Sequence, residues 1–377
     1  MKPIYFLGLM IAFLVIVSLF LRFNPLVRDS LKGNVQDFYV GVDIAYYDLE
    51  GTQSLVNEVS SYTNLIVIGS TGVTYNVTRL DETCQYVYDR NLSFILFTEH
   101  ALPRQWLENA VKLWGSRFLG LYAYDEFGGR QLDHYKYRLV QDASNSTDAG
   151  IRYVNSLNRT LSSIRGSYGS SVNLPLFSSD YGLYWFDYKA GYDVVFAEFG
   201  WNFSRQLNVA LCRGAAAVQD RDWGVMITWT YDGSPYIESG DKLFEDMTLA
   251  YNNGAKYIIV FDSNYDYSQG ILKQEHLTAL KQFWEYTKSN PRTKDAVENH
   301  VAYVLPENFG YGFRGPTDKI WGMWEADAPS KELCSNLNGL LEQYGTNLDI
   351  IYDDSTKAGS AVAYSKLVFW NGTVQIR

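Results

Sequence analysis

Eight short apolar segments recur along the chain, each rich in Val, Ile, Leu, Phe or Tyr. Their length and their β-branched and aromatic content are typical of buried strands. Helix-like patterns follow most of them, and a regular alternation of strand and helix favours a parallel sheet. The eight predicted strands are Phe38–Tyr47, Asn64–Ser70, Ser93–His100, Phe118–Glu126, Leu174–Tyr181, Asp193–Trp201, Gly224–Tyr231 and Tyr257–Asn264.

The segments between these strands predict the helices of an α/β protein. The longest insertion, Gly129–Asn173, follows the fourth strand. Pro103 suits the first turn of its helix, and Gly254 follows the end of another. Eight strands alternating with helices predict a closed (β/α)8 barrel over residues 37–298. The predicted helices are Gln53–Tyr62, Leu80–Arg90, Pro103–Arg117, Gln131–Val140, Thr147–Gly166, Arg205–Gln219, Ser239–Asn252 and Gln274–Ser289.

The pattern changes near Asn299, where a small α/β appendage is predicted over residues 299–377. The loop Asn308–Pro316 and the segment Trp321–Trp324 are expected to fold back over the barrel's cleft. The appendage is predicted to contain strand Val301–Leu305, helix Glu332–Tyr344, and strands Leu348–Tyr352 and Leu367–Trp370.

The N-terminus predicts a transmembrane helix. Ile4–Leu21 is an 18-residue run without a charge, which is long enough to span a bilayer at about 1.5 Å of rise per residue. We interpret residues 1–23 as a membrane anchor and residues 24–36 as a tether. A cleaved signal peptide is the alternative, although no small-x-small cleavage site follows the run.

The orientation of this anchor rests on two opposing patterns. Arg22, Arg28 and Lys32 follow the run, which by the positive-inside rule would place the barrel in the cytoplasm. Six glycosylation triplets and a Tyr-rich composition favour the opposite side. We therefore expect a single-pass membrane protein whose barrel faces outside the cell. The triplets begin at Asn76, Asn91, Asn145, Asn158, Asn202 and Asn371.

Composition narrows the classes of partner. The net charge is −10 and the chain has no basic, aromatic-interleaved stripe, which argues against a nucleic-acid partner. The 30 Tyr and 10 Trp residues are typical of a cleft in which rings stack on sugars, or alternatively of a large aromatic core. Three widely spaced cysteines, Cys84, Cys212 and Cys334, form no metal or disulfide motif and predict buried thiols.

Acidic residues mark the ends of the predicted strands. Seven of the eight runs end in a carboxylate or an acid–aromatic cluster, and parallel barrel strands bring their C-terminal ends to one face. The sharpest signal is the pair Asp125-Glu126 before two glycines. Because adjacent strand residues point to opposite faces, we predict Glu126 as the general acid/base and Asp125 as its orienting partner. The alternative is that Asp125 caps a helix and Glu126 pairs with a rim arginine.

A second catalytic acid is expected from another strand. Glu198 lies in an apolar run, and such surroundings would raise its pKa; a buried ion pair is the alternative. Asp232 closes the seventh strand and is the next candidate. The remaining strand-end residues are predicted to bind substrate together with Asp125: Asp43, Tyr47, Glu99, His100, Tyr124, Asp180, Tyr181, Trp201, Trp229, Tyr231 and Asp262. For the acids among them, hydrogen bonds to one another are the alternative.

Over Phe38–Asn290, this placement of acids resembles the TIM-barrel glycoside hydrolase superfamily. In its largest clan the acid/base is a Glu ending the fourth strand, which Glu126 matches, and the nucleophile is a Glu ending the seventh. The seventh strand here ends with Thr228–Asp232 and lacks that Glu. The resemblance therefore implies an Asp nucleophile, an inverting enzyme that uses Glu198, or a barrel that binds sugar without cutting it.

Two alternatives to a glycosidase remain, a metal-dependent hydrolase and a non-catalytic binding protein. Glu99, His100, Asp43 and Asp125 have ligand chemistry for a metal, but the chain has only four histidines, so no zinc or two-metal site is predicted and calcium at the rim acids stays an alternative. The chain has no phosphate loop, Gly-x-Ser-x-Gly elbow or nucleotide fingerprint, so no cofactor is predicted. We expect a membrane-anchored, extracytoplasmic glycosidase; the alternative is a non-catalytic carbohydrate-binding or envelope protein.

Overall fold

The computed structural model describes residues 38–133, 139–168, 172–292, 300–354 and 364–376. The predicted anchor and tether lie outside these residues. Among the described residues, no helix combines the length and the apolar character needed to cross a membrane.

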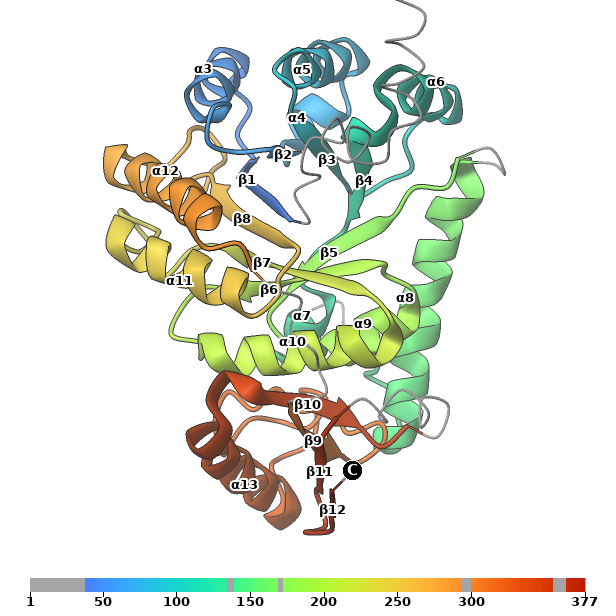
Figure 1. The fold of residues 1–377 in the computed structure, drawn as a ribbon. Helices are drawn as coiled ribbons and strands as arrows, with labels where there is room; N and C mark the ends of the chain where they lie inside the picture. The colour runs from blue at the N-terminus through green and yellow to red at the C-terminus, as the bar shows by residue number, and fades with distance from the viewer. Residues whose placement is uncertain (1–37, 134–138, 169–171, 293–299, 355–363, 377) are drawn as a thin grey trace, which may run out of the picture. The chain divides into compact units, whose positions relative to one another are not determined.

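Eight parallel strands close into a barrel in chain order, as predicted (Figure 1). The first strand pairs with both the second and the eighth, which closes the ring. Each observed strand lies within, or within two residues of, its predicted segment. The strands are β1 (Tyr39–Ile44), β2 (Leu65–Ile68), β3 (Ser93–Thr98), β4 (Phe118–Ala123), β5 (Leu176–Asp180), β6 (Val194–Phe199), β7 (Asp222–Ile227) and β8 (Tyr257–Asp262).

Helices follow the strands and cover the outside of the barrel (Figure 1). Side chains at the position before the first turn accept from backbone amides in several of them, as Asn76 does for α5 and Ser204 for α10. The prediction missed the short helices α4 and α9, and it began α3 and α7 four residues too late. Residues 134–138 of the predicted helix Gln131–Val140 lie outside the described residues. The helices are α3 (Leu49–Val59), α4 (Thr71–Thr74), α5 (Val77–Asp89), α6 (Arg104–Trp114), α7 (Phe127–Leu132), α8 (Ser146–Tyr168), α9 (Tyr184–Ala190), α10 (Arg205–Gln219), α11 (Gly240–Asn252) and α12 (Gln274–Ser289).

Large side chains fill the middle of the barrel. The rings of Tyr39 and Tyr257 stack with their centroids 5.1 Å apart, and Phe177 meets Tyr257 edge to face. Aliphatic residues such as Val67 and Ile259 complete this buried cluster. The barrel therefore has a packed core, as closed parallel barrels of this size do. The three cysteines are buried and free, as predicted.

The C-terminal region forms a four-stranded mixed sheet in the order β10-β9-β11-β12. Three of its strands and its helix match the predicted elements. The three-residue β12 was missed because all its residues are exposed, so no buried face left a mark in the sequence. The elements are β9 (Val301–Leu305), α13 (Ala328–Tyr344), β10 (Leu348–Tyr352), β11 (Lys366–Phe369) and β12 (Val374–Ile376).

Helix α10 joins this sheet to the barrel, and Figure 1 shows it between the two. Thirteen of its fifteen residues are buried. Gly214 lets the backbone of β10 approach, because a Cβ at this position would lie 2.5 Å from the carbonyl oxygen of Ile350. Beside it, the guanidinium Nε of Arg213 pairs with Asp349 at 2.7 Å, and both side chains are buried. The sheet and the barrel thus share one packed layer.

Candidate active site

A cavity of about 630 Å³ opens at the C-terminal end of the barrel. Each of the eight strands contributes at least one lining residue, either from its C-terminal end or from the segment that follows it. The lining residues are Asp43, Ala45, Tyr47, Gly69, Thr71, Phe97, Glu99, Tyr122, Asp125, Glu126, Arg130, Ser179, Glu198, Met226, Thr228, Trp229, Phe261, Tyr265 and Tyr267. We call this space the mouth cavity.

Asp125 and Glu126 both line the mouth cavity, contrary to the prediction that they would face opposite ways. That prediction assumed that both residues belong to the strand, but β4 ends at Ala123. Tyr124 and Glu126 then adopt left-handed backbone conformations, with φ of 64° and 55°. The chain therefore turns sharply after the strand, and the alternation of side chains no longer applies.

A single guanidinium ties the two carboxyl groups together. Arg130 on α7 approaches Glu126 at 3.0 Å and Asp125 at 3.4 Å, so the predicted alternative of a rim arginine for Glu126 is present in the structure. Burial raises the pKa of Asp125 to about 7, with a further rise from Glu126 and an opposing effect from Arg130. The pKa of Glu126 is also raised by burial, although Arg130 lowers it. The pair can therefore hold a proton near neutral pH.

Asp180 fixes the turn that carries this pair. Its carboxylate accepts hydrogen bonds from the amides of Gly128 and Gly129, at 2.6 and 2.7 Å. Glu126 in turn donates its own amide to the carbonyl of Ser179 at 2.9 Å. Asp180, predicted to bind substrate, is instead buried and occupied by backbone amides, and it positions α7 against β5.

Glu198 lies on the floor of the mouth cavity with 5% of its surface exposed. The hydroxyl of Ser179 donates to its carboxylate at 2.6 Å, and the Tyr122 hydroxyl lies 2.6 Å from Ser179. Burial, followed by the charge of Glu126, raises the pKa of Glu198 well above its ordinary value, which is the direction its apolar flanks predict. The ion pairs of the described residues include none to Glu198, so the predicted alternative of a buried ion pair is not seen.

Asp43 lies next to the C-terminal end of β1, lines the mouth cavity, and is 2% exposed. Its Oδ1 is buried and has no hydrogen-bond partner among the described residues. Burial raises the pKa of Asp43, and the charges of Asp125 and Asp262 raise it further. An unpaired carboxyl group at the edge of an open cavity is costly to bury, and a ligand that donates hydrogen bonds would offset that cost.

Aromatic rings border the mouth cavity on the β7, β8 and β1 side. Tyr47, Tyr265 and Tyr267 are 45%, 72% and 41% exposed, although large rings are usually more buried. Trp229 is held in place by a 2.8 Å hydrogen bond from its indole nitrogen to the carbonyl of Ser263. Exposed rings next to a polar floor offer flat apolar faces to a ligand that also carries polar groups.

The structure brings together seven of the predicted site residues in the mouth cavity: Asp43, Tyr47, Glu99, Asp125, Glu126, Glu198 and Trp229. The other eight do not line it. Besides Asp180, Asp262 is buried and accepts from the amides of Ile271 and Leu272. Asp232 and Tyr231 are exposed in the turn after β7. The remaining four are His100, Tyr124, Tyr181 and Trp201, of which Tyr181 donates its hydroxyl to Asp133 and His100 stacks on Tyr75.

Several lining residues were not predicted. Ser179 and Tyr122 could have been found as inward-facing positions on predicted strands, and Tyr265 and Tyr267 follow the eighth strand directly. Arg130 lies four residues after Glu126, one helical turn away, but the predicted helix began too late to reveal this spacing. Most of these residues are small or aromatic, so in the sequence they resemble core residues.

The loop Asn308–Pro316 and the segment Trp321–Trp324 do not cover the mouth cavity, because none of their residues lines it. The Trp321 ring is buried against Phe186, with centroids 4.7 Å apart. Its carbonyl accepts from the Gln131 side chain at 2.8 Å. The segment therefore packs on the helices outside the barrel, because a large apolar ring gains more from burial there than from exposure at a rim.

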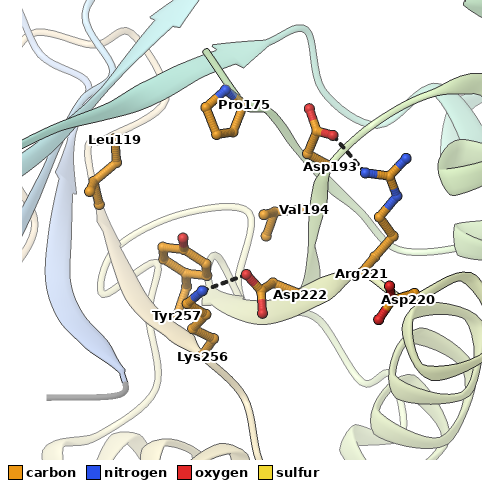
Figure 2. Close-up of a pocket in the computed structure, with 9 residues that line it drawn as sticks. All are labelled: Leu119, Pro175, Asp193, Val194, Asp220, Arg221, Asp222, Lys256 and Tyr257. Atoms are coloured by element: carbon orange, nitrogen blue, oxygen red, sulfur yellow. Dashed lines mark hydrogen bonds and ion pairs between the residues drawn. The ribbon is translucent and has the colours of Figure 1, made fainter. Parts of the chain in front are cut away.

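A second cavity, of about 440 Å³, lies at the opposite end of the barrel, where the strands begin (Figure 2). We call it the base cavity. Four of its five charged side chains form two ion pairs: Arg221 lies 2.8 Å from Asp193, and Lys256 lies 2.5 Å from Asp222. Arg165 also contacts Asp193 at 2.8 Å. This end of a parallel barrel generally contributes to stability rather than to catalysis.

Comparisons with known proteins support the fold alone. No protein-family model and no curated protein match the sequence. The structure is similar to a β-galactosidase from the psychrophilic Marinomonas ef1, with a TM-score of 0.56 and 9% identity over 88% of this chain and 72% of that chain. A β-glycosidase has a TM-score of 0.44 and 7% identity over 69% and 98% of the two chains.

Proteins of other activities are similar as well. The orotidine 5′-monophosphate decarboxylase from Methanocaldococcus jannaschii has a TM-score of 0.35 and 12% identity over 66% of this chain and 97% of that chain. Identities this low establish the barrel architecture without assigning a reaction, since one barrel fold supports many chemistries.

Proposed function

We propose that this protein is a glycoside hydrolase that cleaves a carbohydrate in the mouth cavity. The observation that carries the proposal is the convergence of Asp125, Glu126 and Glu198 on one open cavity at the C-terminal ends of the strands. Glycosidic cleavage needs a carboxylic acid that is protonated near neutral pH and a second carboxyl group that attacks or activates water.

In this proposal Glu126 protonates the leaving oxygen, and Asp125 orients it. The raised pKa of both groups supports an acid that keeps its proton until the bond breaks. Arg130 holds the pair in place and stabilises the carboxylate that remains after proton transfer. The pairing also limits where the two carboxyl groups can move, which favours precise placement of the proton.

Glu198 supplies the second carboxyl group, which must lose its proton before it attacks or activates water, because burial raises its pKa. Asp232 lies outside the mouth cavity, and the seventh strand presents Thr228 and Trp229 there instead of an acid. The hydrogen bond from Ser179 fixes one carboxylate oxygen of Glu198 and leaves the other for a water molecule or for the sugar carbon. The exposed rings of Tyr265 and Tyr267 would stack on the pyranose rings of the substrate.

The ion pairs from Arg130 to both acids favour one competing function, carbohydrate binding without cleavage, because they oppose protonation of Asp125 and Glu126. The test is a screen of residues 36–377 against aryl glycosides and polysaccharides, alongside Glu126→Gln and the control Asp232→Asn. Sugar release by the parent and the control, but not by Glu126→Gln, would support hydrolysis. Equal binding by all three proteins without release would leave the binding function.

We also propose that the barrel faces outside the cell behind an N-terminal anchor. All six asparagines of the glycosylation triplets are exposed in the structure, and this supports access for a glycosyltransferase. Mass spectrometry of the protein isolated from membranes of its own host is the test. Glycan masses on these asparagines would support the orientation, and unmodified peptides at all six sites would contradict it.

A further inference from the structure

We propose that the sugar bound in the mouth cavity carries a protonated amino group, as a hexosamine without an N-acyl substituent does, and that Asp43 receives this group. The inference rests on the proposed function and names its substrate class. Its basis is the distribution of charge across the cavity, together with one buried carboxyl group that lacks a partner.

The mouth cavity contains five carboxyl groups and one guanidinium group. Arg130 is committed to Asp125 and Glu126. Within the described residues, no ion pair reaches the other three carboxyl groups, which belong to Asp43, Glu99 and Glu198. A cation in this cavity would favour the ionised form of these carboxyl groups, whereas an anionic ligand would oppose it.

Asp43 is the independent observation that points to a ligand. It is 2% exposed and its Oδ1 has no hydrogen-bond partner among the described residues. Gly69 leaves room for this carboxyl group, because a Cβ at that position would lie 2.1 Å from Oδ1. An ammonium group provides three donors and a positive charge, so it could satisfy the carboxyl group that the protein leaves unpaired.

The charged groups around Asp43 come from several elements. Asp125 follows β4 and Asp262 ends β8, and both raise the pKa of Asp43. Burial raises the pKa of Tyr122 on β4, and the charges of Asp125, Glu198 and Asp43 raise it further. The basic side chain near these acids is Arg130, which pairs with Asp125. Asp43, Asp125 and Glu198 all line the mouth cavity.

The aromatic rim favours an organic cation over a metal ion. Trp229, Tyr265 and Tyr267 line the same cavity, and the faces of aromatic rings attract a cation as well as the apolar face of a pyranose. A metal ion would use the carboxyl groups but not the rings. A sugar that carries an amine uses both, with its ring on the aromatic side and its ammonium group on the acidic floor.

The test is calorimetric binding of two matched ligands, a β-1,4-linked glucosamine tetramer and its fully N-acetylated form, to the full chain carrying Glu126→Gln. We expect the amine to bind at least tenfold more tightly, with the preference weakening as salt is added. Titrations in two buffers of different ionisation enthalpy should show proton release for the amine alone, because an ammonium group favours ionised carboxyl groups. Equal or tighter binding of the N-acetylated ligand would overturn the inference.

Variants localise the effect. Asp43→Asn should abolish the preference for the amine, whereas the exposed Asp232→Asn should keep it. If Asp43→Asn does not fold, the salt dependence and the proton release of Glu126→Gln still decide the question. Binding of Ca²⁺ alone that displaces the amine without any effect of the aromatic substitution Tyr265→Ala would assign the carboxyl groups to a metal and overturn the proposal.

The two proposals fail separately. Cleavage of neutral aryl glycosides by the parent, without tighter amine binding, would remove the inference and keep the hydrolase. Tight amine binding without cleavage of any glycoside would keep the inference and remove the hydrolase.

Discussion

The two ends of the barrel carry cavities of similar polarity but opposite organisation. At the base cavity, Asp193 and Asp222 each have a basic partner within 2.8 Å (Figure 2). The mouth cavity has five carboxyl groups and one guanidinium group, Arg130, which pairs with only two of them, Asp125 and Glu126. Paired charges on an exposed surface contribute little beyond local order, whereas unpaired carboxyl groups in a concave site raise the free energy of the unliganded protein. The contrast supports the proposal that a ligand binds at the mouth cavity.

The largest effect is expected from Glu126→Gln at the mouth. Removal of a general acid lowers kcat by about 10²- to 10⁴-fold, while binding of the uncleaved sugar stays close to that of the parent. Asp222→Asn, which breaks a pair at the base, is the matched control and should leave kcat unchanged. Steady-state kinetics on the best substrate of the screen measures kcat for both variants. An equal loss of kcat in the two would contradict the assignment of catalysis to the mouth cavity.

Asp43→Asn should stabilise the protein in the absence of ligand. The pKa of Asp43 is raised in the folded state, so folding favours its protonated form, and the free energy of unfolding falls as the pH rises above the unfolded value of about 4. We expect a gain at pH 7, where folding opposes the ionisation of Asp43, and none at pH 3, where the carboxyl group is protonated in both states. Urea unfolding at both pH values measures it; a loss of stability at pH 7 would mean that Asp43 has a stabilising partner.

Arg130→Gln should shift the pH profile of hydrolysis. Arg130 lowers the pKa of Asp125 and of Glu126, so its removal raises both. A general acid works only while protonated, and the rate falls as the pH rises through its pKa. The falling limb of kcat against pH should therefore move up by about one pH unit, whereas Arg130→Lys should move it less. A shift to lower pH would contradict the assignment.

The smallest effect is expected at the base. Arg221→Gln removes a contact to Asp193, whose side chain is 28% exposed and also binds Arg165. We expect a change of about 0–1 kcal/mol in the free energy of unfolding and no change in kcat. Urea unfolding and kinetics check the two readouts. A loss of several kcal/mol in the free energy of unfolding would show that this ion pair stabilises the fold more than exposed pairs usually do.

The sequence predicted the barrel well because a buried strand leaves a clear apolar segment, and parallel strands must end on one face. The same rule brought Asp43, Glu99, Glu126 and Glu198 to the mouth. It failed for Asp180 and Asp262, which also end strands.

Those two carboxylates accept backbone amides from loops, and the sequence does not reveal how a loop will turn around an acid. The relation between Asp125 and Glu126 was hidden for a similar reason. Their shared orientation depends on the left-handed residues Tyr124 and Glu126, and neither residue type favours that conformation by itself. Backbone geometry after the strand, rather than the pattern of side chains, decided the site.

Because α10 and β10 pack closely, we expect that the barrel cannot be separated from the C-terminal sheet by truncation. A fragment that stops near residue 298 would keep Arg213 but lose Asp349, its partner at 2.7 Å, and would expose the flat surface that Gly214 offers to Ile350. Such a fragment should be poorly soluble despite containing a complete set of barrel strands. A natural barrel that lacks the appendage would need a different α10, with a polar outer face in place of this arginine and glycine.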